Sequence, residues 1–124
     1  MPMLLTITGG CCMAYERGDV LLVPFPFSDL TATKVRPAIV VSSDTYHSTE
    51  PDLILAALTT NLVQVKSTVD YALKGWKAAG LKYPSAFKPV VFTLDPDRVI
   101  HHVGALNKSD LKEVDQRLKR ALGL

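Results

Sequence analysis

Two prolines at the end of the first long apolar run restrict the fold more than any other feature of the sequence. The run from Val20 to Val23 is short and continuous, which is typical of a buried strand, and Pro24-Phe25-Pro26-Phe27 follows directly. A proline has no amide proton to donate, so it is excluded from a strand that has neighbours on both sides. The strand must therefore leave the sheet here or lie at an edge, and we expect at least one phenylalanine to fill the core.

Further short apolar runs follow, separated by turn residues. A second strand is predicted from Ala38 to Ser42, with Pro37 at its first position, and a third from Leu53 to Leu58. Residues 44–52 between them are predicted to form a turn region. Other elements are expected at 68–73, 90–94 and 99–103 (strands) and at 75–81 (a turn followed by a short helix). Together the runs indicate a meander of antiparallel strands.

The C-terminal segment carries the clearest helical pattern. One face is apolar at a spacing of 3.6 residues, with Ser109 as the expected N-cap and Gly123 at the position of a C′ glycine. The apolar residues of this face are Leu111, Val114, Leu118 and Leu122. We therefore expect a mainly β fold with few helices, a small, strongly bent sheet or barrel of antiparallel strands with a C-terminal α-helix packed on it.

Charge is distributed unevenly along the 124 residues. The net charge is +2, but residues 1–65 carry −3 and residues 66–124 carry +5. A basic second half can attract a polyanion, or it can be an ordinary solvated surface. Apolar residues make up 48% and charged residues 21%, which is usual for one globular domain.

The N-terminal residues are treated separately. Cys11 and Cys12 are adjacent, and neighbouring Cα atoms lie too close for ordinary disulfide geometry, so a reducing, cytoplasmic setting is expected. The chain offers no zinc-ligand set and no apolar stretch long enough to span a membrane. We expect residues 1–13 to be a disordered extension or a misassigned start, followed by a single domain at 14–124.

Arg36 is the first candidate for chemistry. Pro37 excludes the α region for the residue before it, which holds Arg36 extended at the start of a strand. A planar guanidinium on a rigid support suits a phosphate. The alternative is a surface ion pair, with Asp29 as one possible partner.

Polar residues at two other strand ends add further candidates. Thr59 and Thr60 point to opposite faces, so one of them can face the same site as Arg36, although both can also be ordinary strand-end residues. The acid–base candidates are His47, His101 and His102. Neighbours in a strand cannot both line one site, which separates the last two. The sequence has no carboxylate pair, phosphate-cradling glycine loop or nucleophile elbow.

Several of these segments together resemble one family. The stretches 18–30 and 34–42, with Leu58-Thr59-Thr60-Asn61 and residues 76–81, are similar to the MazF/PemK toxins of type II toxin–antitoxin pairs, and the similarity covers residues 14–124. The resemblance implies a plug-type barrel related to SH3 folds, usually a homodimer. It implies a cofactor-free, metal-independent endoribonuclease that cuts single-stranded RNA at short sequences and leaves 2′,3′-cyclic phosphate and 5′-hydroxyl ends.

The resemblance also implies roles for individual residues and partners. The family's catalytic arginine and threonine fall on Arg36 and Thr59. The residues expected to contact substrate are Lys34, Thr60, Asn61 and Asp29. The expected partners are the RNA substrate, a cognate antitoxin with an acidic disordered tail, and operator DNA only as the toxin–antitoxin complex; no membrane is expected. Residues 30–34 lack the glutamate that better-known branches carry, which leaves the cut sequence and the general acid and base open.

Two other functions are compatible with this fold. One is a toxin that inhibits DNA gyrase by binding, and the other is an inactive module that binds nucleic acid or antitoxin. The pairing of Arg36-Pro37 with Thr59-Thr60 favours the endoribonuclease, because a pure binder has no need of both.

Overall fold

A single curled sheet forms most of the protein in the computed structural model, which describes residues 15–25, 34–65 and 68–124. All strand pairs are antiparallel and the order across the sheet is β5-β6-β4-β3-β2-β7. The strands are β2 (Asp19–Phe25), β3 (Lys34–Val40), β4 (Leu53–Thr59), β5 (Tyr71–Ala72), β6 (Ala86–Leu94) and β7 (His101–Ala105). The helices are α1 (Asp44–Thr49) and α2 (Lys108–Leu122), with 3₁₀ turns at Leu62–Gln64 and Pro96–Arg98. The expected fold class is confirmed.

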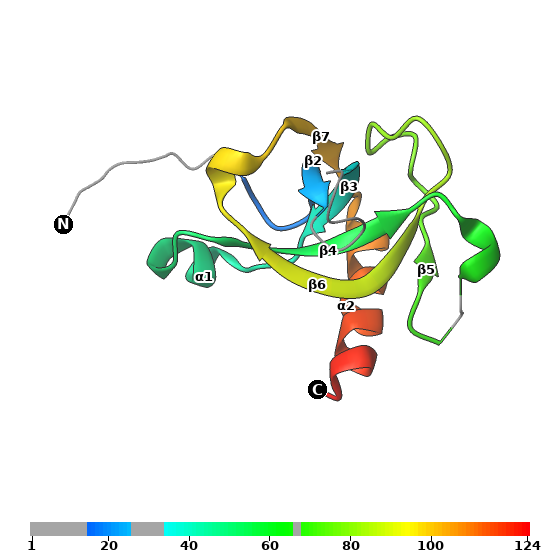
Figure 1. The fold of residues 1–124 in the computed structure, drawn as a ribbon. Helices are drawn as coiled ribbons and strands as arrows, with labels where there is room; N and C mark the ends of the chain where they lie inside the picture. The colour runs from blue at the N-terminus through cyan, green and yellow to red at the C-terminus, as the bar shows by residue number, and fades with distance from the viewer. Residues whose placement is uncertain (1–14, 26–33, 66–67) are drawn as a thin grey trace.

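Contacts across the inside of the sheet show how strongly it curls. β2 and β6 are separated in the sheet by β3 and β4, yet the rings of Phe25 and Phe92 meet edge to face with centroids 5.3 Å apart. A flat sheet would hold two such strands about 14 Å apart. The sheet is therefore a half-barrel, and Figure 1 shows long β6 bending across its front.

The two faces of this half-barrel bury separate cores. On the inner face, strand residues such as Val23, Val40 and Leu55 pack together, with Phe25 partly buried against them as expected. On the outer face, Val114 of α2 and Phe87 are fully buried in the second cluster. Alternate side chains of each strand feed the two cores, which explains the continuous apolar runs.

Pro24 and Pro37 occupy strand positions that lack a ladder partner on one side. β7 pairs with β2 only as far as Leu22, so Pro24 has a neighbour on one side alone, Val35 of β3. This agrees with the predicted edge position, and Pro26 lies outside the described residues. β3 begins at Lys34, three residues before Pro37, where the strand was expected to start. Pro37 therefore lies inside the strand, where it pairs with Leu22. The ladder to β4 starts only at Ala38, so the missing amide of Pro37 removes no bond on that side.

Three connections differ from the sequence predictions. The predicted turn region contains α1, because the Oγ of Ser43 accepts a hydrogen bond from the Tyr46 amide and caps a helix. The predicted strand at 68–73 is reduced to Tyr71–Ala72. The predicted short helix at 75–81 is instead a series of turns, in which Gly80 adopts a φ of 92°.

This loop of turns is seated on β7 by close backbone contact. A Cβ on Gly104 would lie 2.2 Å from the Ala79 carbonyl oxygen, and a Cβ on Gly80 would lie 2.5 Å from the Val103 carbonyl oxygen. Only glycine permits this approach. The sequence after Gly80 is thereby held against the sheet, where it contributes to the site described below.

Helix α2 begins earlier than predicted and ends as predicted. The cap is Asn107, whose side-chain oxygen accepts from the Asp110 amide, so Ser109 is not the N-cap. Gly123 has a φ of 74°, the left-handed conformation of a C′ residue. Leu122 is 58% exposed rather than part of the apolar seam, because the last turn of the helix extends beyond the sheet (Figure 1).

A buried carboxylate ties α2 to the strand below it. Asp110 is 1% exposed and accepts hydrogen bonds from the Tyr71 hydroxyl at 2.6 Å and from the amides of Lys74 and Gly75 at 3.3 and 2.8 Å. Burial, followed by the hydrogen bond to Asp110, raises the pKa of Tyr71 well above its ordinary value.

The raised pKa of Tyr71 predicts a loss of stability at high pH. The native state keeps this phenol protonated while the unfolded chain releases its proton from about pH 10 upward. The contribution to the free energy of unfolding is thus complete below that pH and falls as the pH rises above it. We expect Tyr71→Phe to be less stable than wild type at pH 8 and to show a shallower decline between pH 9 and 11, measured by urea unfolding. Parallel pH profiles of the two proteins would contradict this.

Candidate functional site

Arg36 has an unusual environment for an arginine. Strand β3 places it opposite Val23 of β2, and its guanidinium carbon lies 5.6 Å from the centre of the Phe25 ring. The side chain is half-buried, and its Nε atom is buried without a hydrogen-bond partner among the described residues. A buried donor without a partner is costly, so its presence here points to a ligand that supplies the acceptor.

Thr59 approaches the same face of the sheet. β3 and β4 pair as far as Ala38 and Ala57. Arg36 and Thr59 each lie two residues beyond that pair, so the alternation of strand side chains puts both on the face of Ala38 and Ala57. The Thr59 hydroxyl oxygen accepts a hydrogen bond from the Asn61 amide at 3.1 Å. Its own hydrogen is not used in that bond and can be donated to a bound group.

A shallow cavity of about 420 Å³ opens where these strands end. Besides Arg36 and Lys34, Thr60 lines it, whereas Thr59 does not. The full lining is Lys34, Val35, Arg36, Pro37, Leu58 and Thr60. We call this the arginine cavity. Its two basic residues and the absence of any acid from the lining described here make it attractive to an anion.

A second cavity of about 410 Å³ adjoins the first. The two share Pro37 and Thr60, so they form one groove. We call the second one the apolar cavity, because most of its lining is apolar; it comprises Leu22, Pro37, Thr60, Gly80, Leu81, Lys82, Tyr83, Ser85, His101 and Val103. The loop after Gly80 and the first residue of β7 close it on the side away from Arg36.

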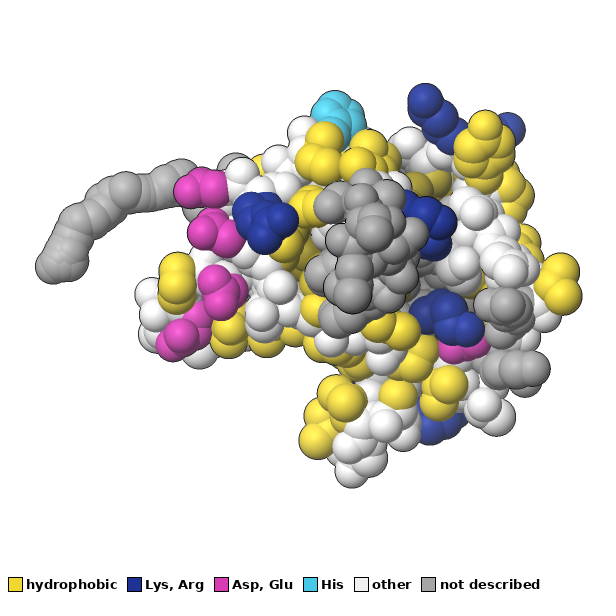
Figure 2. All heavy atoms as spheres, viewed as in Figure 1, with side chains coloured by type: hydrophobic (Ala, Val, Ile, Leu, Met, Phe, Trp, Pro, Cys, Tyr) yellow, Lys and Arg dark blue, Asp and Glu magenta, His cyan; other side chains and the backbone are white. Residues whose placement is uncertain are grey.

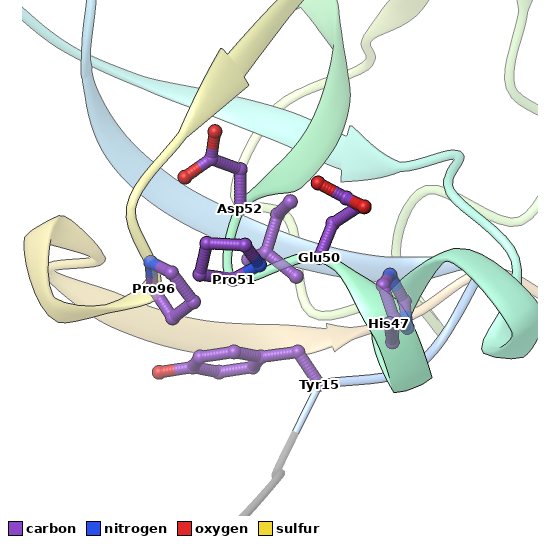
Figure 3. A pocket seen from close by; sticks show the side chains of 7 residues that line it. Tyr15, His47, Glu50, Pro51, Asp52 and Pro96 are labelled. Atoms are coloured by element: carbon purple, nitrogen blue, oxygen red, sulfur yellow. The ribbon is translucent and has the colours of Figure 1, made fainter. Parts of the chain in front are cut away.

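A third, smaller cavity of about 120 Å³ has the opposite charge. Figure 3 shows Tyr15 lying across from Pro51 and Pro96, with Glu50 and Asp52 beside them, where α1 leads into β4. Figure 2 shows acidic side chains gathered at the α1 end of this face, whereas most basic ones lie toward the other end. An anionic ligand is therefore favoured at the groove and disfavoured here.

The three histidines are separated by the fold. His101 lines the apolar cavity, while His102 points to the other face, with its Nε2 3.4 Å from the Asp19 carboxylate. The prediction that these neighbours cannot line one site is confirmed. His47 lies at the small acidic cavity, 2.5 Å from the Ser42 hydroxyl, which also accepts from the Ile54 amide. His47 therefore supports the α1 connection rather than the groove.

Two further residues, Asn61 and Asp29, were expected to contact the substrate. Asn61 is exposed just after β4, and its backbone amide donates the hydrogen bond that orients the Thr59 hydroxyl. Asp29 lies outside the described residues. Sequence reasoning did not assign Lys82 or Tyr83 to the site, and it named His101 only as one of three acid–base candidates. An exposed aromatic beside a lysine, in a loop bounded by Gly80 and Pro84, was the available signal, because such pairs are common in nucleic-acid grooves.

Across residues 15–25, 34–65 and 68–124, no three histidine, cysteine or acidic side chains come together as metal ligands. Over the same ranges, no helix is both long and apolar enough to cross a bilayer.

Comparison with known proteins agrees with this fold. The family model described as PemK-like, MazF-like toxin of type II toxin–antitoxin system matches residues 16–122. The chain therefore belongs to this toxin family, and the resemblance drawn from its motifs is confirmed. A curated relative, Endoribonuclease MazF of Staphylococcus epidermidis, is 29% identical over 110 residues, which are 88% of this chain and 92% of that protein. The expected endoribonuclease activity agrees with that name.

Solved structures with the same fold include toxins bound to antitoxins. An endoribonuclease in complex with its cognate antitoxin from a mycobacterial species has a TM-score of 0.69 and 19% identity, covering 90% of this chain and 97% of its own. MazE-MazF from Deinococcus radiodurans has a TM-score of 0.71 and 18% identity, covering 91% and 99%. At these identities the structures establish the shared fold.

Proposed function

We propose that this toxin is a metal-independent endoribonuclease that cleaves single-stranded RNA in the groove beside Arg36. The observations that carry the proposal are that the Nε of Arg36 is buried without a hydrogen-bond partner among the described residues, and that Arg36 lines a cavity together with a second basic residue, Lys34. A phosphodiester offers the charge and the acceptor oxygens that this donor lacks.

The chemistry requires no external nucleophile. The ribose 2′-oxygen attacks the adjacent phosphorus, the bond from phosphorus to the 5′-oxygen breaks, and the 2′-hydroxyl proton is lost while the 5′-oxygen gains one. The ends are a 2′,3′-cyclic phosphate and a 5′-hydroxyl. A guanidinium stays protonated, so Arg36 acts by stabilising the charge that develops on the phosphoryl oxygens, not as a base.

Thr59 complements Arg36 in this scheme. Because the Asn61 amide already donates to its oxygen, the hydroxyl is oriented and its hydrogen can bond a phosphoryl oxygen. Two donors fixed on neighbouring strands favour in-line geometry. Thr60 and Lys34 also line the cavity, and they bind the RNA on either side of the reacting phosphate.

The partners follow from the family and from charge. We infer a cognate antitoxin whose acidic, disordered tail covers the basic groove, since the antitoxin-bound structures above share this fold. We also infer a homodimer acting in the cytoplasm, and operator DNA binding only by the toxin–antitoxin complex.

The proposal is tested with purified protein and defined single-stranded RNA, with and without a chelator. We expect cleavage in both conditions, with cyclic phosphate at the 3′ end of each upstream fragment, identified by mass spectrometry. A double-stranded RNA of the same sequence is the control substrate. Loss of cleavage in chelator would contradict metal independence, and no cleavage of any RNA together with inhibited DNA supercoiling would identify a gyrase poison instead.

The two neighbouring threonines should differ in their effect. We expect Thr59→Ala to lower kcat by about 10- to 100-fold, the loss of one hydrogen bond to a charged group. Thr59→Ser keeps the hydroxyl and should retain most activity. Thr60→Ala should mainly raise KM, because Thr60 lines the groove without the orienting bond from Asn61. A larger fall in kcat for Thr60→Ala than for Thr59→Ala would exchange their roles.

A further inference from the structure

The apolar cavity has an unusual combination of lining groups for its place in the groove. Its floor is built from apolar residues of three neighbouring strands and the loop, whereas Lys82, Tyr83 and His101 contribute polar or aromatic groups. Leu22 pairs with Pro37 on one side and His101 on the other, so these three form one row across the sheet. Pro37 and Thr60 also line the arginine cavity, so the apolar cavity adjoins the proposed phosphate site.

We propose that the apolar cavity binds one unstacked nucleobase of the RNA, next to the phosphate held by Arg36, with the ring of Tyr83 as its stacking surface. This inference rests on the proposed function and names the part of the substrate that the second cavity takes. The cavity volume of about 410 Å³ falls within the ordinary range of small-ligand sites.

Tyr83 is exposed and yet held in place. Its side chain is 66% exposed, a large value for an aromatic residue beside a cavity. The backbone beneath it is fixed, because the hydroxyl of Ser85, 2% exposed, donates to the Tyr83 carbonyl at 2.9 Å and the Leu73 amide donates to the Ser85 carbonyl at 3.0 Å. An exposed aromatic ring on an anchored backbone is a preorganised stacking surface, and any base can stack on it.

The charges around the cavity favour RNA over a neutral, apolar peptide segment. Lys82 adjoins Tyr83 and can contact the next backbone phosphate, while Lys34 and Arg36 lie at the other end of the groove. His101 and Ser85 offer hydrogen-bonding groups to a base edge. A peptide that placed only an apolar side chain here would leave the lysine and the histidine without partners.

The test uses a non-cleavable RNA, with a 2′-O-methyl group at the mapped cleavage position, and measures its affinity by fluorescence anisotropy. We expect Tyr83→Ala to weaken binding about 10-fold and Tyr83→Phe to bind as wild type, since stacking needs the ring and not the hydroxyl. Tyr46→Ala, in α1 at the other end of the molecule, is the matched control. Lys82→Ala should lower the salt dependence of binding by about one phosphate contact.

Replacing single bases by abasic sites identifies the occupant. At one position beside the cleavage site, the abasic RNA should bind wild type about 10-fold more weakly, and at that position Tyr83→Ala should cause no further loss. Unchanged affinity of Tyr83→Ala for every RNA would overturn the inference. So would a loss confined to a synthetic acidic antitoxin tail, which would assign the cavity to the antitoxin. Cleavage by wild type that disappears in Arg36→Ala leaves the proposed function standing whatever Tyr83 does, so the two failures are distinguishable.

Discussion

Replacing Arg36 with alanine is expected to reduce RNA cleavage by about 100- to 1,000-fold, the usual loss when one fixed donor to a developing oxyanion is removed. The fall should appear in kcat, measured under single-turnover conditions, because the charge on the phosphoryl oxygens is greatest in the transition state. Arg36→Lys should recover little, since an ammonium group is a point charge without the planar fork of a guanidinium.

The same substitution should hardly affect the fold. The Nε of Arg36 has no hydrogen bond among the described residues, so removing it breaks none there, and the contact with Phe25 is the main packing lost. We expect the melting temperature of Arg36→Ala to stay close to that of wild type. Arg98→Ala, in the exposed turn after β6, is the control for loss of a positive charge. Cleavage near the wild-type rate in Arg36→Ala, with the fold intact, would refute the mechanism.

Replacing Asp110 with alanine is expected to cause the largest loss of stability. The change leaves the Tyr71 hydroxyl and the amides of Lys74 and Gly75 without their acceptor inside the protein. A buried donor without a partner costs about 1–3 kcal/mol, and only the Tyr71 hydroxyl is fully buried, while the two amides are partly buried and cost less. We therefore expect the free energy of unfolding to fall by about 3–4 kcal/mol. That is a large part of the total for a domain of this size, about 5–15 kcal/mol.

Chemical unfolding followed by the fluorescence of Trp76, which packs against the same core, measures this loss. Asn107→Ala should cost about 1 kcal/mol, because it removes the helix cap. Ser109→Ala is the matched control and should change stability by less than about 0.5 kcal/mol, since Ser109 is exposed and caps nothing. Equal effects of Asp110→Ala and Ser109→Ala would contradict the anchoring role of the buried carboxylate.

Local signals predicted the strand at 53–58 well, and the strand at 68–73 and the start of α2 less well. The early prolines indicated a strand with a missing neighbour, and the register of β7 explains this at Pro24. Ser109 and Asn107 are both good N-cap residues, and the sequence pattern did not separate them. In the structure the cap is Asn107. A helix that starts there has Asp110 at its third position, where the buried carboxylate can accept the hydrogen bond from the Tyr71 hydroxyl. The start of the helix therefore depends on a contact between residues 39 positions apart in the sequence.

The loop at 75–81 shows a similar limit. Its composition is compatible with a short helix, but close backbone contacts with β7 at Gly80 and Gly104 enforce turns instead. Those contacts hold the residues that follow, Lys82 and Tyr83, against the sheet. Local propensity carries no information on which distant strand a loop will meet, so the second half of the groove was not predicted.

The sequence by itself determined the mainly β fold and the prominence of Arg36, because proline geometry and apolar periodicity act over a few residues and need no distant partner. The toxin family was indicated by the resemblance of its motifs, and the family model over residues 16–122 confirms it. Only the tertiary structure decided what surrounds that arginine. The register of β3 with β4 brings Thr59 to its face, and the curl of the sheet puts Phe25 beside it. Pairing of three strands then sets His101 in one row with Pro37. These relations depend on strand register and sheet curvature, which are fixed by the packing of both cores together.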